Sequence, residues 1–215
     1  MSQFKLVVFD MDGTLIKEKG IFIIAEKKGF LDELLRLLRN EDMQYYERSI
    51  EVAKLSKGHK TSEFLEIFRK IKLQNDVEKI IKVLKKNKIK SAIVTDSYQF
   101  LADDLKKRLS IDYAFANNLI INNDMITGEL IINNKDLKED VCNGRIFSIN
   151  KGCILEQLSC DLGININETI AVGDGRVDIS MIKKAGLGIA FNAPDEVQKH
   201  AEINTKDLGI ILNYI

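Results

Sequence analysis

The chain has 215 residues, of which 45% are hydrophobic and 30% are charged, and its 32 Lys and Arg side chains balance its 32 Asp and Glu side chains. This composition is typical of a folded protein of one or two domains and excludes a largely disordered chain. A net charge of zero disfavours a nucleic-acid partner, which requires a basic face. The apolar runs are too short to span a bilayer and the N-terminus lacks a secretory signal pattern, so we expect a cytoplasmic protein with no membrane partner.

Hydrophobic patterning predicts a strand over residues 5–9, followed at once by a polar turn over residues 10–14. From residue 16 to residue 72, apolar residues recur at three- and four-residue spacing and predict three helices. Beyond this block, helices are predicted at 77–86, 100–109, 152–162 and 177–185, and strands at 91–94, 113–116, 169–172 and 187–190. Residues 119–121 and 126–132 predict the two arms of a hairpin.

Strands that alternate with helices predict a parallel sheet with helices on both faces. The helical block separates the first strand from the rest of this pattern. We therefore expect an α/β fold: a doubly wound, Rossmann-like core of residues 1–15 and 76–215, with a small helical cap of residues 16–75 inserted into it.

Polar residues follow several of the predicted strands. Asp10 and Asp12 follow the first strand, Thr95 the second and Asp174 the strand at 169–172. Ligands of open α/β sheets bind at the carboxyl ends of the strands, so these side chains are expected to meet. Carboxylates that lie this close need a cation, and an oxygen-only set without His or Cys indicates Mg²⁺.

Three further residues belong to the same expected site. Gly13 lets the chain turn sharply and bring backbone amides near a phosphate. Asp178 lies four residues after Asp174 at the start of a predicted helix, and Lys151 supplies a cation. Each feature also has a purely structural interpretation, as a polar turn, a helix cap or a surface lysine. The occurrence of all three together favours a functional site.

Asp10-Met11-Asp12-Gly13-Thr14, Thr95, Lys151 and Gly173-Asp174-Gly175-x-x-Asp178 resemble the four ordered motifs of the haloacid dehalogenase superfamily. Residues 113–117, 126–129 and 181–187 resemble its phosphoserine phosphatase branch, which has a similar helical insertion. The resemblance implies a phosphatase in which Asp10 is the nucleophile and Asp12 the general acid and base.

The resemblance also implies the remaining roles. Mg²⁺ would be held by Asp10, the backbone carbonyl of Asp12, and Asp174. The phosphoryl group would be bound by Thr95, Asp96, Lys151 and Gly13, and Asp178 would orient Lys151 or a metal-bound water.

Substrate selection is less well defined by the resemblance. In that branch a Glu contacts the ammonium group of the substrate, and the aligned residue here is Lys19, beside Glu18. The cap Arg of that branch aligns near Ala53, and Arg48 lies a turn and a half away on the same predicted helix. Glu18, Lys19 and Arg48 are therefore candidate substrate contacts. We expect a small phosphate ester as the substrate, with phosphoserine one candidate, and a monomer or homodimer.

Two other functions are compatible with these motifs. A phosphomutase of the same superfamily would share Asp10 and Asp12 but would transfer the phosphoryl group instead of releasing phosphate. A receiver-like phospho-acceptor domain also uses acidic residues, a Thr, a Lys and Mg²⁺, but it lacks an acid and base equivalent to Asp12.

Overall fold

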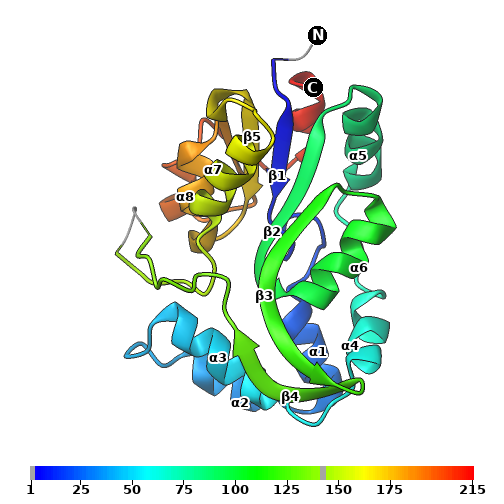
Figure 1. Ribbon diagram of the computed structural model, residues 1–215, viewed down its shortest axis with the longest axis vertical. Coiled ribbons are helices and arrows are strands. Elements are labelled where there is room, and N and C mark those ends of the chain that lie inside the picture. The colour runs from blue at the N-terminus through cyan, green and yellow to red at the C-terminus, as the bar shows by residue number, and fades with distance from the viewer. Residues whose placement is uncertain (1–2, 141–143) are drawn as a thin grey trace.

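The computed structural model describes residues 3–140 and 144–215. These residues form a seven-stranded sheet with the strand order β4-β3-β2-β1-β5-β6-β7 (Figure 1). Neighbouring strands are parallel except for the antiparallel pair β3 and β4. The strands are β1 (Leu6–Phe9), β2 (Lys90–Tyr98), β3 (Tyr113–Asn122), β4 (Met125–Ile131), β5 (Thr169–Gly173), β6 (Leu187–Phe191) and β7 (Ile203–Thr205).

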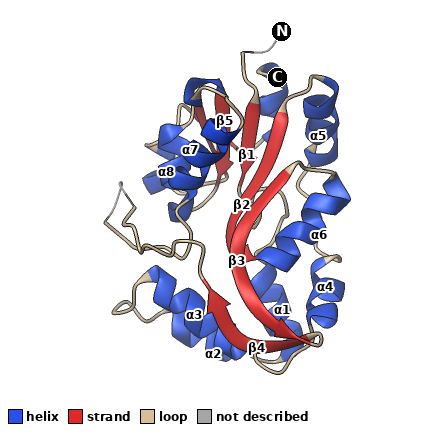
Figure 2. Cartoon of the chain, viewed as in Figure 1, coloured by secondary structure: helices blue, strands red, loops and turns tan. Residues whose placement is uncertain are grey.

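Helices cover both faces of the sheet (Figure 2). They are α5 (Val77–Lys86), α6 (Gln99–Leu109), α7 (Lys151–Asp161), α8 (Ile179–Lys184) and the short α9 (Asp195–Gln198). Because successive strand residues point to opposite faces, Val7 and Phe9 of β1 pack with α5 and α6, whereas Leu6 and Val8 pack with α7 and α8. None of the helices in the described residues combines the length and apolar character needed to cross a bilayer.

Four helices are inserted between β1 and β2 and form the cap: α1 (Gly20–Lys28), α2 (Leu31–Leu38), α3 (Tyr45–Leu55) and α4 (Thr61–Phe68). Their buried side chains, such as Ile24, Leu34 and Phe64, belong to the same hydrophobic cluster as Phe9 of the sheet. The predicted α/β class with an inserted helical cap is therefore confirmed, while the division at residues 15 and 76 stays a prediction.

The hairpin β3–β4 reaches from the core sheet to the cap (Figure 1). Gly58 N–H donates to Ile126 O, and Ile126 N–H donates to His59 O, both at 2.9 Å. The turn between α3 and α4 is thus hydrogen-bonded to β4, and α3 packs against this strand.

The structure differs from the sequence prediction in several elements. The predicted strand at 113–116 and the hairpin arm at 119–121 are one strand, β3, because the buried Asn117 amide forms hydrogen bonds of its own and does not interrupt the strand. Strand β2 runs on through Asp96 to Tyr98. The cap has four helices instead of three, since the contiguous apolar residues of α1 show no helical spacing. Strand β7 was not predicted.

Candidate active site

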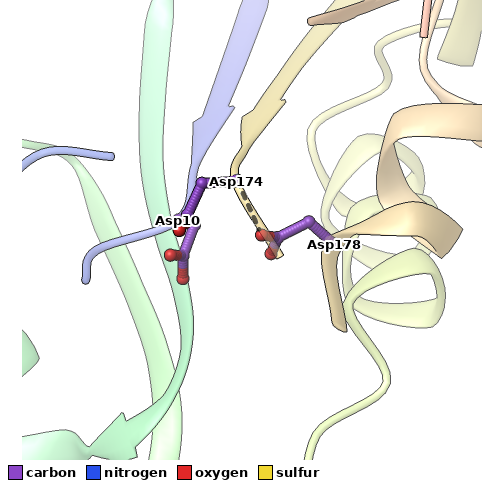
Figure 3. Close-up of side chains that lie close together, drawn as sticks. All are labelled: Asp10, Asp174 and Asp178. Atoms are coloured by element: carbon purple, nitrogen blue, oxygen red, sulfur yellow. Dashed lines mark hydrogen bonds between the residues drawn. The ribbon is translucent and has the colours of Figure 1, made fainter. Parts of the chain in front are cut away.

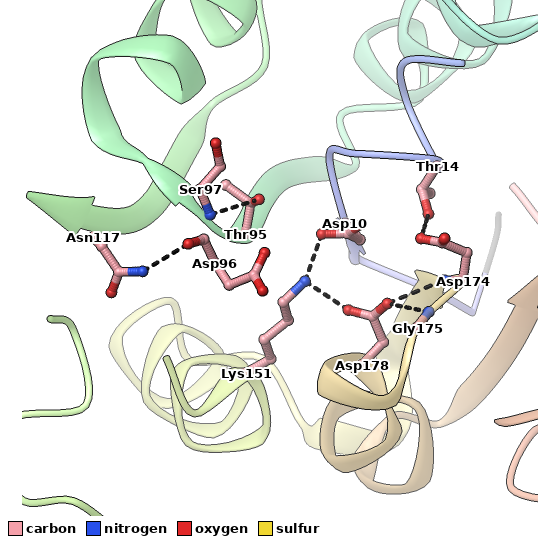
Figure 4. A network of polar contacts seen from close by, with 10 residues as sticks. All are labelled: Asp10, Thr14, Thr95, Asp96, Ser97, Asn117, Lys151, Asp174, Gly175 and Asp178. Atoms are coloured by element: carbon pink, nitrogen blue, oxygen red, sulfur yellow. Dashed lines mark hydrogen bonds and ion pairs between the residues drawn. The ribbon is translucent and has the colours of Figure 1, made fainter. Parts of the chain in front are cut away.

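The functional residues predicted from the motifs gather at the carboxyl ends of β1, β2 and β5 (Figure 4). Asp10 directly follows β1, Asp96 lies near the end of β2, and Asp174 directly follows β5. Because β1 is paired with both β2 and β5, these three strand ends are neighbours in the sheet. The parallel topology thus brings together residues that are more than 160 positions apart in the chain.

Lys151 is the cation at the centre of this site. It is the first residue of α7, is fully buried, and its Nζ donates to Asp10 Oδ1 at 2.5 Å and to Asp178 Oδ1 at 2.6 Å (Figure 4). Burial lowers the pKa of Lys151, but the charges of Asp10 and Asp178 outweigh it and raise the pKa overall. Lys151 is therefore a permanent ammonium beside Asp10.

Asp178 fixes the loop that follows β5. Its second oxygen, Oδ2, accepts the backbone N–H groups of Asp174 at 3.0 Å and Gly175 at 2.9 Å. The predicted helix at 177–185 begins only at Ile179, after a 3₁₀ turn over Arg176–Asp178, so Asp178 folds back under the loop. A side chain at Gly173 would overlap the Asp178 side chain, which explains the glycine.

Three carboxylates form a cluster that could hold a cation. Carboxylate oxygens of Asp10, Asp174 and Asp178 lie within 4.8 Å of one another (Figure 3). Burial raises the pKa of Asp10 and of Asp174, and the charge of Asp178 raises both further. Desolvated carboxylates in an all-oxygen set fit a hard divalent cation such as Mg²⁺. Since both Asp178 oxygens already accept hydrogen bonds, Asp10 and Asp174 are the side chains best placed as ligands.

The first motif supports Asp174 from the other side. Thr14 Oγ1 donates to Asp174 Oδ1 at 3.3 Å. Gly13 has a φ of +96°, and a Cβ atom there would lie 2.6 Å from Asp174 Oδ2. Gly13 is thus required for the close approach of this turn to the acidic cluster.

Asp12 faces the cap and lies outside the acidic cluster. Its Oδ1 accepts the backbone N–H of Gly20, the first residue of α1, at 2.5 Å. Burial raises the pKa of Asp12 to about 7, although the Gly20 N–H opposes the shift. A carboxyl group that titrates near neutral pH can both give and take a proton there.

The segment at the end of β2 contributes backbone and hydroxyl groups. Thr95 is fully buried, and its Oγ1 accepts the Ser97 N–H at 3.3 Å. The Asp96 carbonyl accepts from Asn117 Nδ2 at 2.7 Å, which ties this segment to β3. The Asp96 carboxylate is exposed to the pocket, where it adds negative charge near Asp12.

A pocket of about 410 Å³ lies over these residues, between core and cap. Of the three candidate substrate contacts, Lys19 and Arg48 line this pocket, whereas Glu18 lines a separate depression with Ile23 and Ile67. Burial lowers the pKa of Lys19, but Asp174 and Asp96 oppose this effect and raise it overall, so Lys19 stays charged.

Sequence reasoning missed the residues that join cap and core at this pocket. The Tyr45 and Phe147 rings stack with their centroids 4.7 Å apart, and Ser49 Oγ donates to Ser148 Oγ at 3.0 Å. Tyr45 OH also accepts from Arg176 Nη1 at 3.1 Å. Residues 147 and 148 lie in a segment without periodicity or motif, so the sequence carried no signal for them.

Comparison with known proteins identifies the class to which this site belongs. Residues 7–183 match the family of haloacid dehalogenase-like hydrolases, and the chain belongs to this family. The expected resemblance is thereby confirmed, and the expected phosphatase class is confirmed by the relatives described next.

Individual relatives are similar over nearly the whole chain. The phosphoserine phosphatase of Methanocaldococcus jannaschii is 35% identical over 98% of this chain and 97% of its own, and that of Lactococcus lactis is 30% identical over 98% and 94%. A solved phospho-aspartyl intermediate analogue of phosphoserine phosphatase superposes with a TM-score of 0.82 at 32% identity, covering 99% of both chains. A substrate-bound phosphoserine phosphatase complex gives the same score and identity over 99% and 98%.

Proposed function

We propose that the protein is a Mg²⁺-dependent phosphomonoester hydrolase that acts on a small phosphorylated metabolite in the cytoplasm through an aspartyl-phosphate intermediate. The observation that carries this proposal is the placement of Asp10. This carboxylate ends β1 at the pocket, is bound on one oxygen by the buried Lys151, and lies within 4.8 Å of the Asp174 carboxylate. The proximity of a carboxylate that can act as nucleophile, a buried cation and a candidate metal ligand supports the proposal.

The chain's own groups account for both chemical steps of the proposed reaction. An Asp10 oxygen attacks phosphorus, and the bond to the alcohol oxygen breaks while Asp12 gives its proton to that oxygen. Asp12 then removes a proton from the water that attacks the aspartyl-phosphate, and phosphate leaves. A pKa of about 7 suits Asp12 to both roles near neutral pH.

Charge on the transferring phosphoryl group must be neutralised throughout. Lys151 supplies one fixed positive charge, and the buried Thr95 hydroxyl supplies a further donor. Mg²⁺, which Asp10, Asp174 and the Asp12 carbonyl would hold, supplies further positive charge against the phosphoryl oxygens. Asp178 is a positioning residue in this scheme, because its two oxygens hold Lys151 and the loop of Asp174.

Phosphate release from p-nitrophenyl phosphate and from phosphoserine, with Mg²⁺ and with EDTA, tests the proposal. We expect Mg²⁺-dependent release that falls by at least about 10³-fold in Asp10→Asn. The exposed Asp136→Asn is the matched control and should retain activity. Acid-quenched enzyme should carry a phosphoryl group on Asp10. Release that survives Asp10→Asn would refute the proposal.

Product analysis separates the two alternatives. A phosphomutase would convert a sugar phosphate to its isomer without releasing phosphate, and a receiver-like domain would be phosphorylated once without multiple turnovers. Sustained release of inorganic phosphate excludes both.

A further inference from the structure

The cap side of the pocket is largely apolar. Ile21 and Phe22 of α1, Leu38 of α2 and Val52 of α3 line it, and Leu130 of β4 joins them. Each of these five side chains is only partly buried, so each presents apolar surface to the cavity. The acidic residues of the lining, by contrast, all come from the core side of the pocket.

Arg48 interrupts this apolar wall. Its guanidinium carbon lies 5.0 Å from the Tyr45 ring centroid, and Nη1 donates to Leu38 O at 3.3 Å. Its Nε is buried without a hydrogen-bond partner, and no ion pair to Arg48 forms within residues 3–140 and 144–215. A buried donor of this kind costs free energy unless a ligand satisfies it, and a guanidinium is matched by an anionic oxygen.

The charges on the cap wall disfavour an ammonium group. The cap contributes two cations to the described lining, Lys19 and Arg48, and no carboxylate. An amino-acid phosphate ester whose ammonium points toward the cap would therefore place it beside like charge or against apolar side chains, because the carboxylates of the lining, Asp96 included, lie on the core side.

From these observations we infer that the substrate is an alkyl or aryl phosphate whose alcohol part is apolar, lacks an ammonium group and carries an anionic oxygen for Arg48. This inference rests on the proposed phosphatase function and specifies the ester it acts on. The phosphate is held at Asp10 and Lys151, the apolar part contacts the wall of Phe22, Leu38 and Val52, and the anionic end reaches Arg48. A volume of about 410 Å³ lies in the range of small-molecule pockets, about 300–1,000 Å³.

A matched series of esters tests the apolar part. Phosphoserine is compared with 3-phosphonooxypropanoate, which lacks only the amino group, and with 6-phosphonooxyhexanoate, which has three more methylenes. Burial of one methylene contributes about 0.8 kcal/mol, or about four-fold in kcat/KM, so the hexanoate should exceed the propanoate by up to about 60-fold. Phosphoserine should be the poorest of the three.

Variants test the two contacts separately. Val52→Thr keeps the side-chain shape but places a hydroxyl on the wall, and it should reduce the preference for the longer ester. Ile50→Thr, on the same helix and outside the pocket lining, is its control. Arg48→Gln should lower kcat/KM for 6-phosphonooxyhexanoate about 10- to 100-fold and affect hexyl phosphate less. Arg36→Gln, on the exposed side of α2, is the control for that charge.

The outcomes distinguish this inference from the function on which it rests. If p-nitrophenyl phosphate is not hydrolysed with Mg²⁺, the phosphatase proposal itself fails. If hydrolysis depends on Asp10 but phosphoserine is preferred, or chain length has no effect, only the substrate inference is overturned. Melting temperatures measured for every variant separate loss of folding from loss of binding.

Discussion

Replacing Lys151 by Met should destabilise the protein strongly. The substitution keeps the length of the side chain but leaves Asp10 and Asp178 as buried carboxylates without their shared cation. Removing one partner of a buried ion pair costs about 3–5 kcal/mol. At about 2–4 °C per kcal/mol for a chain of this size, the melting temperature should fall by about 6–20 °C.

Thermal unfolding followed by circular dichroism in EDTA at pH 8 measures this loss. The loss should shrink as the pH is lowered, because burial raises the pKa of Asp10 and a protonated Asp10 needs no cation. Lys70→Met is the control, since its i, i+4 pair with Glu66 is exposed and screened by water and contributes little to stability. In Lys151→Met, kcat/KM should also fall by about 10²–10³-fold.

A double mutant separates charge from packing. Adding Asp178→Asn to Lys151→Met removes one of the two stranded charges, while the Asn carbonyl can still accept the backbone N–H groups of the loop. The double mutant should therefore be more stable than Lys151→Met alone. A loss below about 1 kcal/mol for Lys151→Met, or a double mutant that loses the sum of both single effects, would refute this account of the buried cation.

Three further predictions concern the surroundings of Lys151. In metal-free protein, the free energy of unfolding should fall by up to about 4 kcal/mol as the pH rises from about 4 to 7. Folding raises the pKa of Asp12 to about 7, so in this range the folded chain binds one proton that the unfolded chain does not. Added Mg²⁺ should restore the stability. Gly173→Ala should lower the free energy of unfolding by about 1–3 kcal/mol, since the new methyl overlaps Asp178; urea unfolding measures it. Asn117→Ala should lower the free energy of unfolding by about 1–3 kcal/mol for each buried group that it leaves without a hydrogen bond. It removes the Nδ2 donor to Ser148 Oγ, at 2.9 Å, and to the Asp96 carbonyl near the end of β2.

Each of these predictions has a matched comparison. Gly175→Ala adds a methyl that makes no contact closer than 3.6 Å, and it should leave stability within about 0.5 kcal/mol. Asn118→Ala changes the exposed neighbour of Asn117 and should be equally mild. A metal-free protein that gains stability from pH 4 to pH 7, or glycine and asparagine variants that match their controls, would contradict the corresponding argument.

The core of the fold could be predicted from the sequence because its signals are local. Short apolar runs such as Leu6–Phe9 give strands, and the amphipathic spacing of Val77–Lys86 gives a helix. The errors arose where tertiary contacts override local signals. Asn117 is typical of a turn, yet in β3 its amide bonds to Asp96 O and Ser148 Oγ and the strand continues.

The candidate site, too, could be predicted from the sequence only in part. Asp10 and Asp174 could be placed together because both follow buried parallel strands, and topology requires such ends to be neighbours. The contact of Ser49 with Ser148 joins residues 99 positions apart, and no spacing rule connects them. Side-chain direction was equally inaccessible: that Asp12 bonds to the first turn of α1 depends on where the cap sits.

The attachment of the hairpin β3–β4 to the cap holds one wall of the pocket more firmly than the other. The wall that carries Arg48 and Val52 is on α3, which rests on β4 and is pinned to the sheet through Ile126. Admission of a ligand is therefore expected to displace α1 and α2, with their hinge at the paired segments around Ile16 and Leu73, while α3 stays in place. The contacts of Arg48 and Val52 with a ligand would then belong to the part of the enclosure that stays fixed, whereas Phe22 and Leu38 would close onto the ligand after it has entered.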